Sequence, residues 1–137
     1  MLKKLILIFI IATCLYLLIK GSDLLETNIS FLWNIPLGNI LAYLALLSST
    51  VFTLLITSKK TKLFILAKID LVLSILWLPV SILASGNVKV SFSSQSPLSS
   101  DYWYSYTAII VLINLGIILW YGISKLIHYI RQSLSPL

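Results

Sequence analysis

The sequence predicts an all-α integral membrane protein: a four-helix bundle of transmembrane helices in two antiparallel hairpins, with both termini in the cytoplasm. Three observations predict this fold. The 137-residue chain is 59% hydrophobic and only 10% charged, whereas soluble domains have roughly 45–50% apolar and about 25% charged residues. Four apolar runs are each long enough to cross a bilayer. Most basic residues lie where these runs end, as topology signals do.

Composition also narrows the functions that we expect. A net charge of +6 would point to nucleic acid in a soluble protein, but here the basic residues flank apolar runs, so nucleic acid is not an expected partner. Cys14 is the only cysteine and His128 the only histidine, which leaves no intramolecular disulfide and no thiolate metal cluster. Zinc-protease, nucleophile-elbow and phosphate-loop motifs do not occur. We therefore expect no metal, no cofactor and no enzymatic activity.

The first predicted span covers residues 2–19 of a single domain, 1–137, and an external loop covers 20–35. A basic start and an apolar run are also typical of a signal peptide, but no small-residue cleavage site follows this run. The segment that ends at Cys14 faintly resembles a lipoprotein cleavage box. The chain stays apolar beyond it, so a retained span is favoured, and the sequence leaves open whether the cysteine is modified.

The second predicted span covers residues 36–57 and begins at a proline, which needs no backbone partner in a first helical turn. Small residues recur along this span at spacings of four, three and four. They form a helix-packing seam of Gly38, Ala42, Ala45 and Ser49. Small side chains let another helix approach closely in lipid, so we expect the seam to serve helix association and not ligand binding.

A basic cytoplasmic turn, SKKTK over residues 58–62, joins the second span to the third. The positive-inside rule places this turn in the cytoplasm, and Lys3, Lys4, Lys125 and Arg131 then fall on the same side. All of these assignments agree with two cytoplasmic termini. We expect the protein to be integral to a plasma membrane, the inner membrane of a bacterium.

The third predicted span, residues 63–84, contains the acidic residue Asp70. A charge at the centre of a membrane helix costs about 2.5–3.5 kcal/mol on insertion scales, so the other helices must shelter this carboxyl. Ser74 and Trp77 follow it at helical spacing, and we expect the stripe to face the bundle interior. Lys68 lies on the opposite side of the helix, where its long side chain can reach the cytoplasmic interface.

A proline, Pro79, lies near the outer end of the same span. A proline inside a helix leaves the carbonyl four residues earlier, here that of Ile75, without its N–H partner. The sequence therefore predicts a bend near the outer end of the third span.

Aligning the spans by their cytoplasmic ends predicts an intramembrane polar site around Asp70. The members of this site are Asp70, Lys68, Ser74, Ser48, Ser49, Thr13, Asn114 and Tyr121. One interpretation is structural, because interhelical hydrogen bonds can fix the packing of a small bundle. The other is a proton- or cation-coupled site, the default hypothesis for an acid within a span. The protonation state of the carboxyl stays open, because desolvation and hydrogen bonding act on its charged form in opposite directions.

The fourth predicted span covers residues 107–127, and an external loop, 85–106, precedes it. The end of this loop holds the aromatic residues Tyr102, Trp103, Tyr104 and Tyr106. Aromatic residues gather at membrane interfaces and also anchor protein contacts, so an interfacial belt and an external recognition loop are compatible interpretations. The tail from residue 131 onward is expected to be disordered.

In hydropathy and topology alone, the chain resembles small bacterial four-span membrane proteins, among them immunity proteins that protect a cell against pore-forming toxins. No residues can be carried over from this resemblance. Small four-span multidrug exporters have an acid in their first span, and this chain has none there.

Two hypotheses for function follow. The leading one is a non-enzymatic protein, immunity-like or an accessory subunit. Its expected partners are membrane lipid and another membrane protein or an inserting toxin, or a second copy of itself, and the contacts come from the seam and the aromatic loop. The alternative is a small oligomeric proton- or cation-coupled transporter or channel that uses Asp70.

Overall fold

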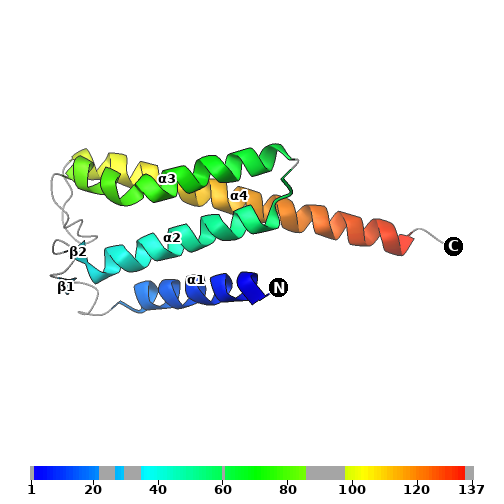
Figure 1. The fold of residues 1–137 in the computed structure, drawn as a ribbon, viewed down its shortest axis with the longest axis horizontal. Coiled ribbons are helices and arrows are strands. Elements are labelled where there is room, and N and C mark those ends of the chain that lie inside the picture. The colour runs from blue at the N-terminus through cyan, green and yellow to red at the C-terminus, as the bar shows by residue number, and fades with distance from the viewer. Residues whose placement is uncertain (1, 22–26, 30–34, 60, 86–97, 135–137) are drawn as a thin grey trace.

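The computed structural model of the chain describes residues 2–21, 27–29, 35–59, 61–85 and 98–134. Over these residues the architecture consists of four long helices, drawn in Figure 1. Each helix is long and apolar enough to cross a membrane. The helical content agrees with the predicted all-α class.

The first two helices lie close to the first two predicted spans. Helix α1 covers Leu2–Lys20 and α2 covers Leu37–Ile56. Between them, the two-residue strands β1 (Asn28–Ile29) and β2 (Ile35–Pro36) pair antiparallel. Helix α2 therefore starts one residue later than predicted, because its expected first residue belongs to the strand pair.

Helix α1 is followed by a residue whose backbone conformation favours glycine. Gly21 follows Lys20 with a φ of 58°, a left-handed conformation that costs other residues steric strain. A residue of this conformation just after the last helical residue is the commonest way for a helix to end.

Helix α3 covers Lys62–Ser85 and packs against α2. Hydrogen bonds stabilise the turn between them. The carbonyl of Ser58 accepts from the backbone N–H of Thr61 at 3.0 Å and from its hydroxyl at 2.8 Å. Helix α3 runs on through Pro79. The Ile75 carbonyl that this proline leaves free accepts a 3.2 Å hydrogen bond from the hydroxyl of Tyr43 on α2.

The last helix, α4, is longer than the predicted fourth span. It covers Leu98–Leu134, so it begins within the predicted external loop, 85–106, and it includes residues 131–134, where disorder was predicted. The aromatic residues of the predicted recognition loop thus lie on the first turns of a helix. The remainder of that loop, 86–97, lies outside the described residues.

Packing explains why α4 begins so early. Trp103, Ile110 and Ile117 recur at a spacing of seven residues, and all three are buried. A spacing of seven returns to the same face of a helix after two turns. The buried face of the span therefore continues backward through the aromatic cluster, and the helix continues with it.

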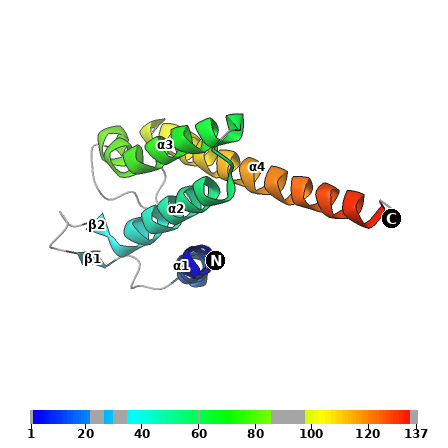
Figure 2. The same ribbon diagram turned by 45° about the vertical axis from the view of Figure 1, so that its right-hand side comes forward.

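Helix α2 is at the centre of the bundle. It packs against α1, α3 and α4, and α3 packs against α4 as well. Figures 1 and 2 show α1 beside α2 at the edge of the bundle, apart from α3. Of the residues of α1, Cys14 alone is buried. The first helix is thus held mainly by one neighbour.

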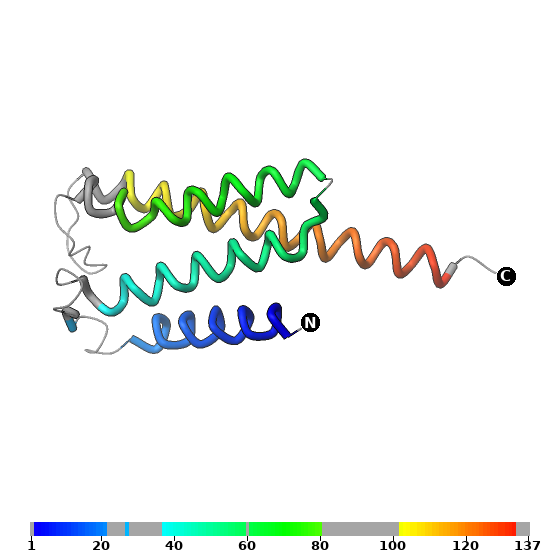
Figure 3. Tube along the Cα trace, viewed as in Figure 1, coloured from blue at the N-terminus to red at the C-terminus, as the bar shows by residue number. Residues whose placement is uncertain are grey.

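Three chain segments gather at one end of the bundle, which we call the turn end. The trace in Figure 3 shows the start of α1, the α2–α3 connection and the C-terminal part of α4 at this end. The last turns of α4 project beyond the other helices there (Figures 1 and 3).

Toward the opposite end, aromatic side chains join α2, α3 and α4. Trp77 and Trp103 are each 1% exposed, and their ring centroids lie 5.2 Å apart. Tyr43 stacks on Trp77 with a centroid distance of 6.1 Å. The indole Nε1 of Trp77 donates a 2.8 Å hydrogen bond to the hydroxyl of Thr107, so the ring is fixed by both packing and hydrogen bonding.

Candidate functional site

A hydrogen-bonded chain of three side chains joins three helices inside the bundle. Asp70 on α3 is fully buried. The side-chain amide of Asn114 on α4 donates a 2.6 Å hydrogen bond from Nδ2 to Oδ2 of Asp70. The hydroxyl of Ser49 on α2 donates in turn to Oδ1 of Asn114 at 3.1 Å. We call these three residues the polar clamp.

Asn114 is the centre of the clamp because its amide offers both donors and an acceptor. Its Nδ2 group also donates to the carbonyl of Ile110, one turn earlier on α4, at 3.0 Å. Both N–H groups and the amide oxygen are therefore used. The bond to Asp70 can form whether the carboxyl is charged or neutral, because the accepting Oδ2 need not carry the proton.

Two oxygen atoms beside the clamp make no hydrogen bond within the described residues: Oδ1 of Asp70 and the hydroxyl of Ser74. Ser74 is fully buried and lies one helical turn after Asp70 on the same face of α3. Burying such groups without a partner costs free energy. These two atoms therefore keep unused hydrogen-bonding capacity inside the bundle.

The predicted polar site is larger than the clamp, and Thr13 is wrongly included in it. Thr13 is exposed on α1, because the neighbouring residue, Cys14, takes the face that packs inward. Tyr121 lies two turns from Asn114 toward the turn end, where the Nζ atom of Lys125 sits 5.9 Å from its ring centroid.

Two further members of the predicted site also lie outside the clamp. Lys68 is exposed, and its Nζ atom lies 4.9 Å from the ring centroid of Phe64, one turn toward the turn end. Ser48 is buried on α2. Among the described residues, no group of three or more His, Cys, Asp or Glu side chains could hold a metal ion.

The residues of the predicted seam lie in two different environments, the core of the bundle and the polar clamp. Gly38 and Ala45 are buried, and Ala42 packs against the Trp77–Trp103 cluster. Ser49 belongs to the clamp. Most of the seam therefore lies inside the bundle, and a partner could reach only its part near the clamp.

The predicted aromatic recognition surface is smaller than expected. Trp103 is buried and Tyr106 is half-buried, with its hydroxyl donating to the carbonyl of Leu73 on α3 at 2.7 Å. Tyr102 and Tyr104 stay exposed, at 78% and 37%. The two inward residues are core residues of the bundle, which corrects their assignment to a recognition loop.

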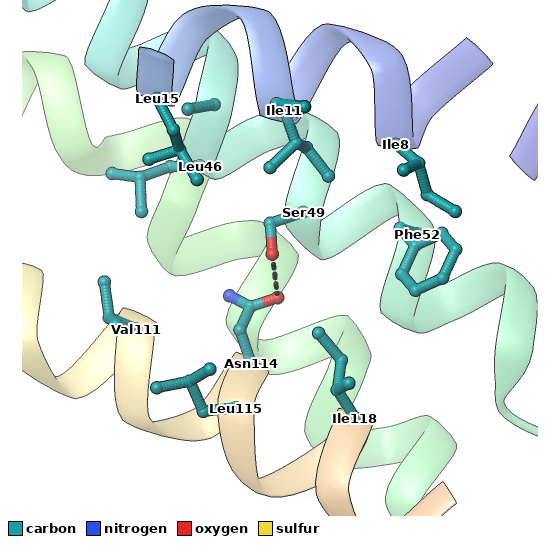
Figure 4. A pocket seen from close by; sticks show the side chains of 12 residues that line it. Ile8, Ile11, Leu15, Leu46, Ser49, Phe52, Val111, Asn114, Leu115 and Ile118 are labelled. Atoms are coloured by element: carbon teal, nitrogen blue, oxygen red, sulfur yellow. Dashed lines mark hydrogen bonds between the residues drawn. The ribbon is translucent and has the colours of Figure 1, made fainter. Parts of the chain in front are cut away.

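A groove with a volume of about 450 Å³ lies between α1, α2 and α4, as Figure 4 shows. It exists because α1 packs on α2 and leaves a space beside α4. Ser49 and Asn114 lie in its floor, and the other lining side chains are apolar. The lining is formed by Ile8, Ile11, Ala12, Leu15, Ala45, Leu46, Ser49, Phe52, Val111, Asn114, Leu115 and Ile118.

The hydrogen-bond donors in the floor of the groove are already used within the protein. The Ser49 hydroxyl proton and both amide N–H groups of Asn114 already have acceptors. An occupant that brought its own hydrogen-bond acceptor would find no free donor on these two residues. Because the lining apart from Ser49 and Asn114 is apolar, the groove favours a mainly apolar occupant.

Sequence reasoning did not find this groove. The signal for it is weak, because helices that are apolar on every side give no contrast between a groove-lining face and any other face. No protein family, curated protein or solved structure matches this chain.

Proposed function

We propose that the protein spans a bacterial inner membrane four times, with both termini and the α2–α3 connection in the cytoplasm. The four apolar helices support the spans. The charges support the orientation: Lys3, Lys4, Lys59 and Lys62 belong to segments at the turn end, and the projecting part of α4 adds Lys125 and Arg131. Positive charge of this kind is retained on the cytoplasmic side.

We further propose that the protein acts without catalysis, by holding a transmembrane helix of another membrane protein or of an inserting toxin in the α1–α2–α4 groove. The observation that carries this proposal is the groove itself, an apolar space open between helices that would lie side by side in lipid. A protein of this kind would be an accessory subunit or an immunity-like protein.

The lining of the groove suits a helix. Ala12, Ala45 and Ser49 are small, and small residues let the backbones of two helices approach closely in lipid, where packing drives association. The lining apart from Ser49 and Asn114 is apolar, so the groove-facing side of the partner should be mainly apolar.

The test uses two neighbouring residues of α1 that are both exposed. Ala12 lines the groove and Thr13 does not. Ala12→Phe fills the groove, so it should abolish co-purification of the partner from native membranes in mild detergent. Thr13→Phe adds a ring of the same size elsewhere and should leave co-purification unchanged. Equal capture by the two variants would reject the groove as the binding surface.

A photoreactive amino acid identifies the partner directly. Placed at Phe52 or Ile118 in the groove, it should form a cross-link to a second protein in native membranes. Placed at Val72, on the exposed side of α3, it should not. If Val72 gives the same adduct as the groove positions, binding is not confined to the groove.

A second candidate function is a proton- or cation-coupled transporter that uses Asp70. The observation that favours it is the pair of buried oxygens, Asp70 Oδ1 and Ser74 Oγ, without hydrogen-bond partners in the described part of the chain. Purified protein in liposomes should then carry proton or cation flux that Asp70→Asn abolishes and Thr13→Ala does not. Flux that persists in Asp70→Asn would exclude this role.

A further inference from the structure

The outer face of α4 carries a regular series of exposed residues, which we call the α4 stripe. The residues are spaced alternately by four and three positions and all are exposed. They are Ser105, Ile109, Leu112, Gly116, Leu119, Ile123, Leu126 and Ile130. An apolar repeat of seven residues, with contacts at two positions in each repeat, is the pattern by which helices pair in coiled coils.

The stripe points away from the rest of the molecule. The buried residues of α4 include Ile110, Asn114 and Ile117, which lie on the other side of the helix at 100° per residue. Gly116 fits this placement, because a Cβ atom added there would meet nothing within 4 Å. The stripe is thus distinct from the groove and from the core.

The last part of the stripe lies beyond the other helices. Lys62, the first residue of α3, precedes Asp70 by eight residues, and Gly122 follows Asn114 by eight. Since Asn114 and Asp70 are bonded and the two helices run in opposite directions, Gly122 lies level with the start of α3. The helix then continues to Leu134, for about 18 Å at 1.5 Å per residue.

Lipid does not explain an apolar surface in this projecting part. In the orientation proposed above, the lysines of the α2–α3 connection mark the cytoplasmic interface. Ile123, Leu126 and Ile130 lie beyond that level and are 52%, 58% and 44% exposed. The sequence-based span ended at residue 127; with the interface set instead at the level of Lys62, acyl chains would cover the earlier stripe residues but not these three.

We propose that the α4 stripe is the interface of a parallel homodimer, in which the α4 helices of two copies form a two-stranded coiled coil that extends into the cytoplasm. Two copies in one membrane share an orientation, and a two-fold axis along the membrane normal makes their α4 helices parallel. The proposal depends on the proposed membrane orientation and not on the groove.

The charges of the projecting part fit this pairing. Lys125 and His128 lie on the opposite side of the helix from the stripe, and Arg131 lies at its flank. The cations of the two copies therefore do not face each other across the interface. The stripe residues on the projecting part of α4 are Ile123, Leu126 and Ile130. All three are aliphatic, as the contact positions of two-stranded coiled coils commonly are.

The direction of α4 favours a second copy over a lipid surface. A helix that binds the membrane surface lies in the plane of the interface, with its apolar face in the headgroup layer. Here α4 continues outward beyond the turn end, past the other helices (Figure 3). The stripe is thus carried out of the membrane plane, where another helix can cover it.

Disulfide cross-linking in native membranes tests the proposal. In a Cys14→Ala background, Ile123→Cys and Ile130→Cys should each give a dimer of twice the 15.4 kDa chain mass upon oxidation. A disulfide needs Cα atoms within about 7 Å of each other, which only a parallel pairing gives for a residue and its own copy at both positions. His128→Cys, on the opposite side, should give little dimer.

Each other result overturns the proposal. No dimer at Ile123 and Ile130, or an equal yield at His128, excludes the stripe as a self-interface. An adduct of another mass identifies a different protein as the occupant, and labelling of Ile123→Cys by a lipid-phase reagent without dimer identifies a membrane surface. Ala12→Phe should leave the cross-link unchanged, so failure of the groove and failure of the dimer can be told apart.

The oligomeric state supplies a second measurement that does not need cysteine. Leu126→Arg places a charge in the stripe and should convert the detergent-solubilised dimer to a monomer in light scattering. Ser124→Arg adds the same charge outside the stripe and should leave the dimer intact. A Leu126→Arg protein that stays dimeric contradicts the proposed interface.

Discussion

The amide of Asn114 on α4 donates a 2.6 Å hydrogen bond to the carboxyl of Asp70 on α3, across 44 residues of chain. Both residues are buried, at 3% and 0% exposure. This bond gives one carboxyl oxygen of Asp70, the one acid in the apolar runs, a hydrogen-bond donor. It also makes an uncharged residue, Asn114, the partner on which the acid depends.

Removing that partner should destabilise the bundle. Asn114→Ala leaves Oδ2 of Asp70 without a donor in a buried site, and an unsatisfied buried polar group costs about 1–3 kcal/mol, more when it is charged. We expect a loss of this size in the free energy of unfolding, measured by denaturant titration in detergent micelles. Ile69→Ala, at an exposed neighbour of the acid, is the control and should cost much less; equal losses would contradict the clamp.

The bond between Ser49 and Asn114 should appear as a coupling free energy. In a double-mutant cycle of Ser49→Ala and Asn114→Ala, we expect an interaction of about 0.5–1.5 kcal/mol, the net value of one hydrogen bond. Thr50→Val is the matched control, because among the described residues the Thr50 hydroxyl bonds only carbonyls of its own helix, at Leu46 and Leu47. A cycle of Thr50→Val with Asn114→Ala should give a coupling close to zero, and a coupling no larger for Ser49 would refute the contact.

The Tyr43 hydroxyl should matter only while Pro79 is present. Tyr43→Phe removes the donor to the Ile75 carbonyl and should cost about 1 kcal/mol of unfolding free energy. In a Pro79→Ala background the new backbone N–H can bond the same carbonyl, so the cost of Tyr43→Phe should shrink. An unchanged cost would mean that the proline does not free this acceptor.

The aromatic residues at the start of α4 should divide into core and surface. Trp103→Ala removes a ring that is 1% exposed, and large-to-small changes of this kind cost about 3–5 kcal/mol. Tyr102→Ala, at a neighbour that is 78% exposed, should change stability by no more than about 0.5 kcal/mol. Thermal unfolding of the two variants in the same detergent measures this difference; similar transition temperatures would contradict the burial of the tryptophan.

Much of the fold follows from local sequence. Apolar runs of membrane-spanning length and basic residues between them predicted four helices, and the limits of α1, α2 and α3 lie close to the predicted spans. Helix α4 extends beyond the predicted fourth span at both ends. Hydropathy falls in the aromatic and serine-rich segment before Thr107, but tertiary packing of Trp103 and Tyr106 outweighs that signal and keeps the segment helical.

The candidate site was predictable only in part. Helical spacing placed Asp70, Ser74 and Trp77 on one face, and all three are buried. Matching depths along antiparallel spans also brought Ser49 and Asn114 near the acid. Depth alone carries no information about which way a residue faces around its helix axis, so the same reasoning wrongly included Thr13, which is exposed.

The order of the clamp residues along the chain has a consequence for biogenesis. Ribosomes release Asp70 before Asn114, so a nascent chain inserted as proposed holds its carboxyl in the bilayer with no amide to meet it until the final helix emerges. Chains that stop early, or whose last helix fails to insert, keep an orphan acid. Because a buried acid without a donor costs free energy, we expect such truncated chains to be less stable in the membrane than the finished protein.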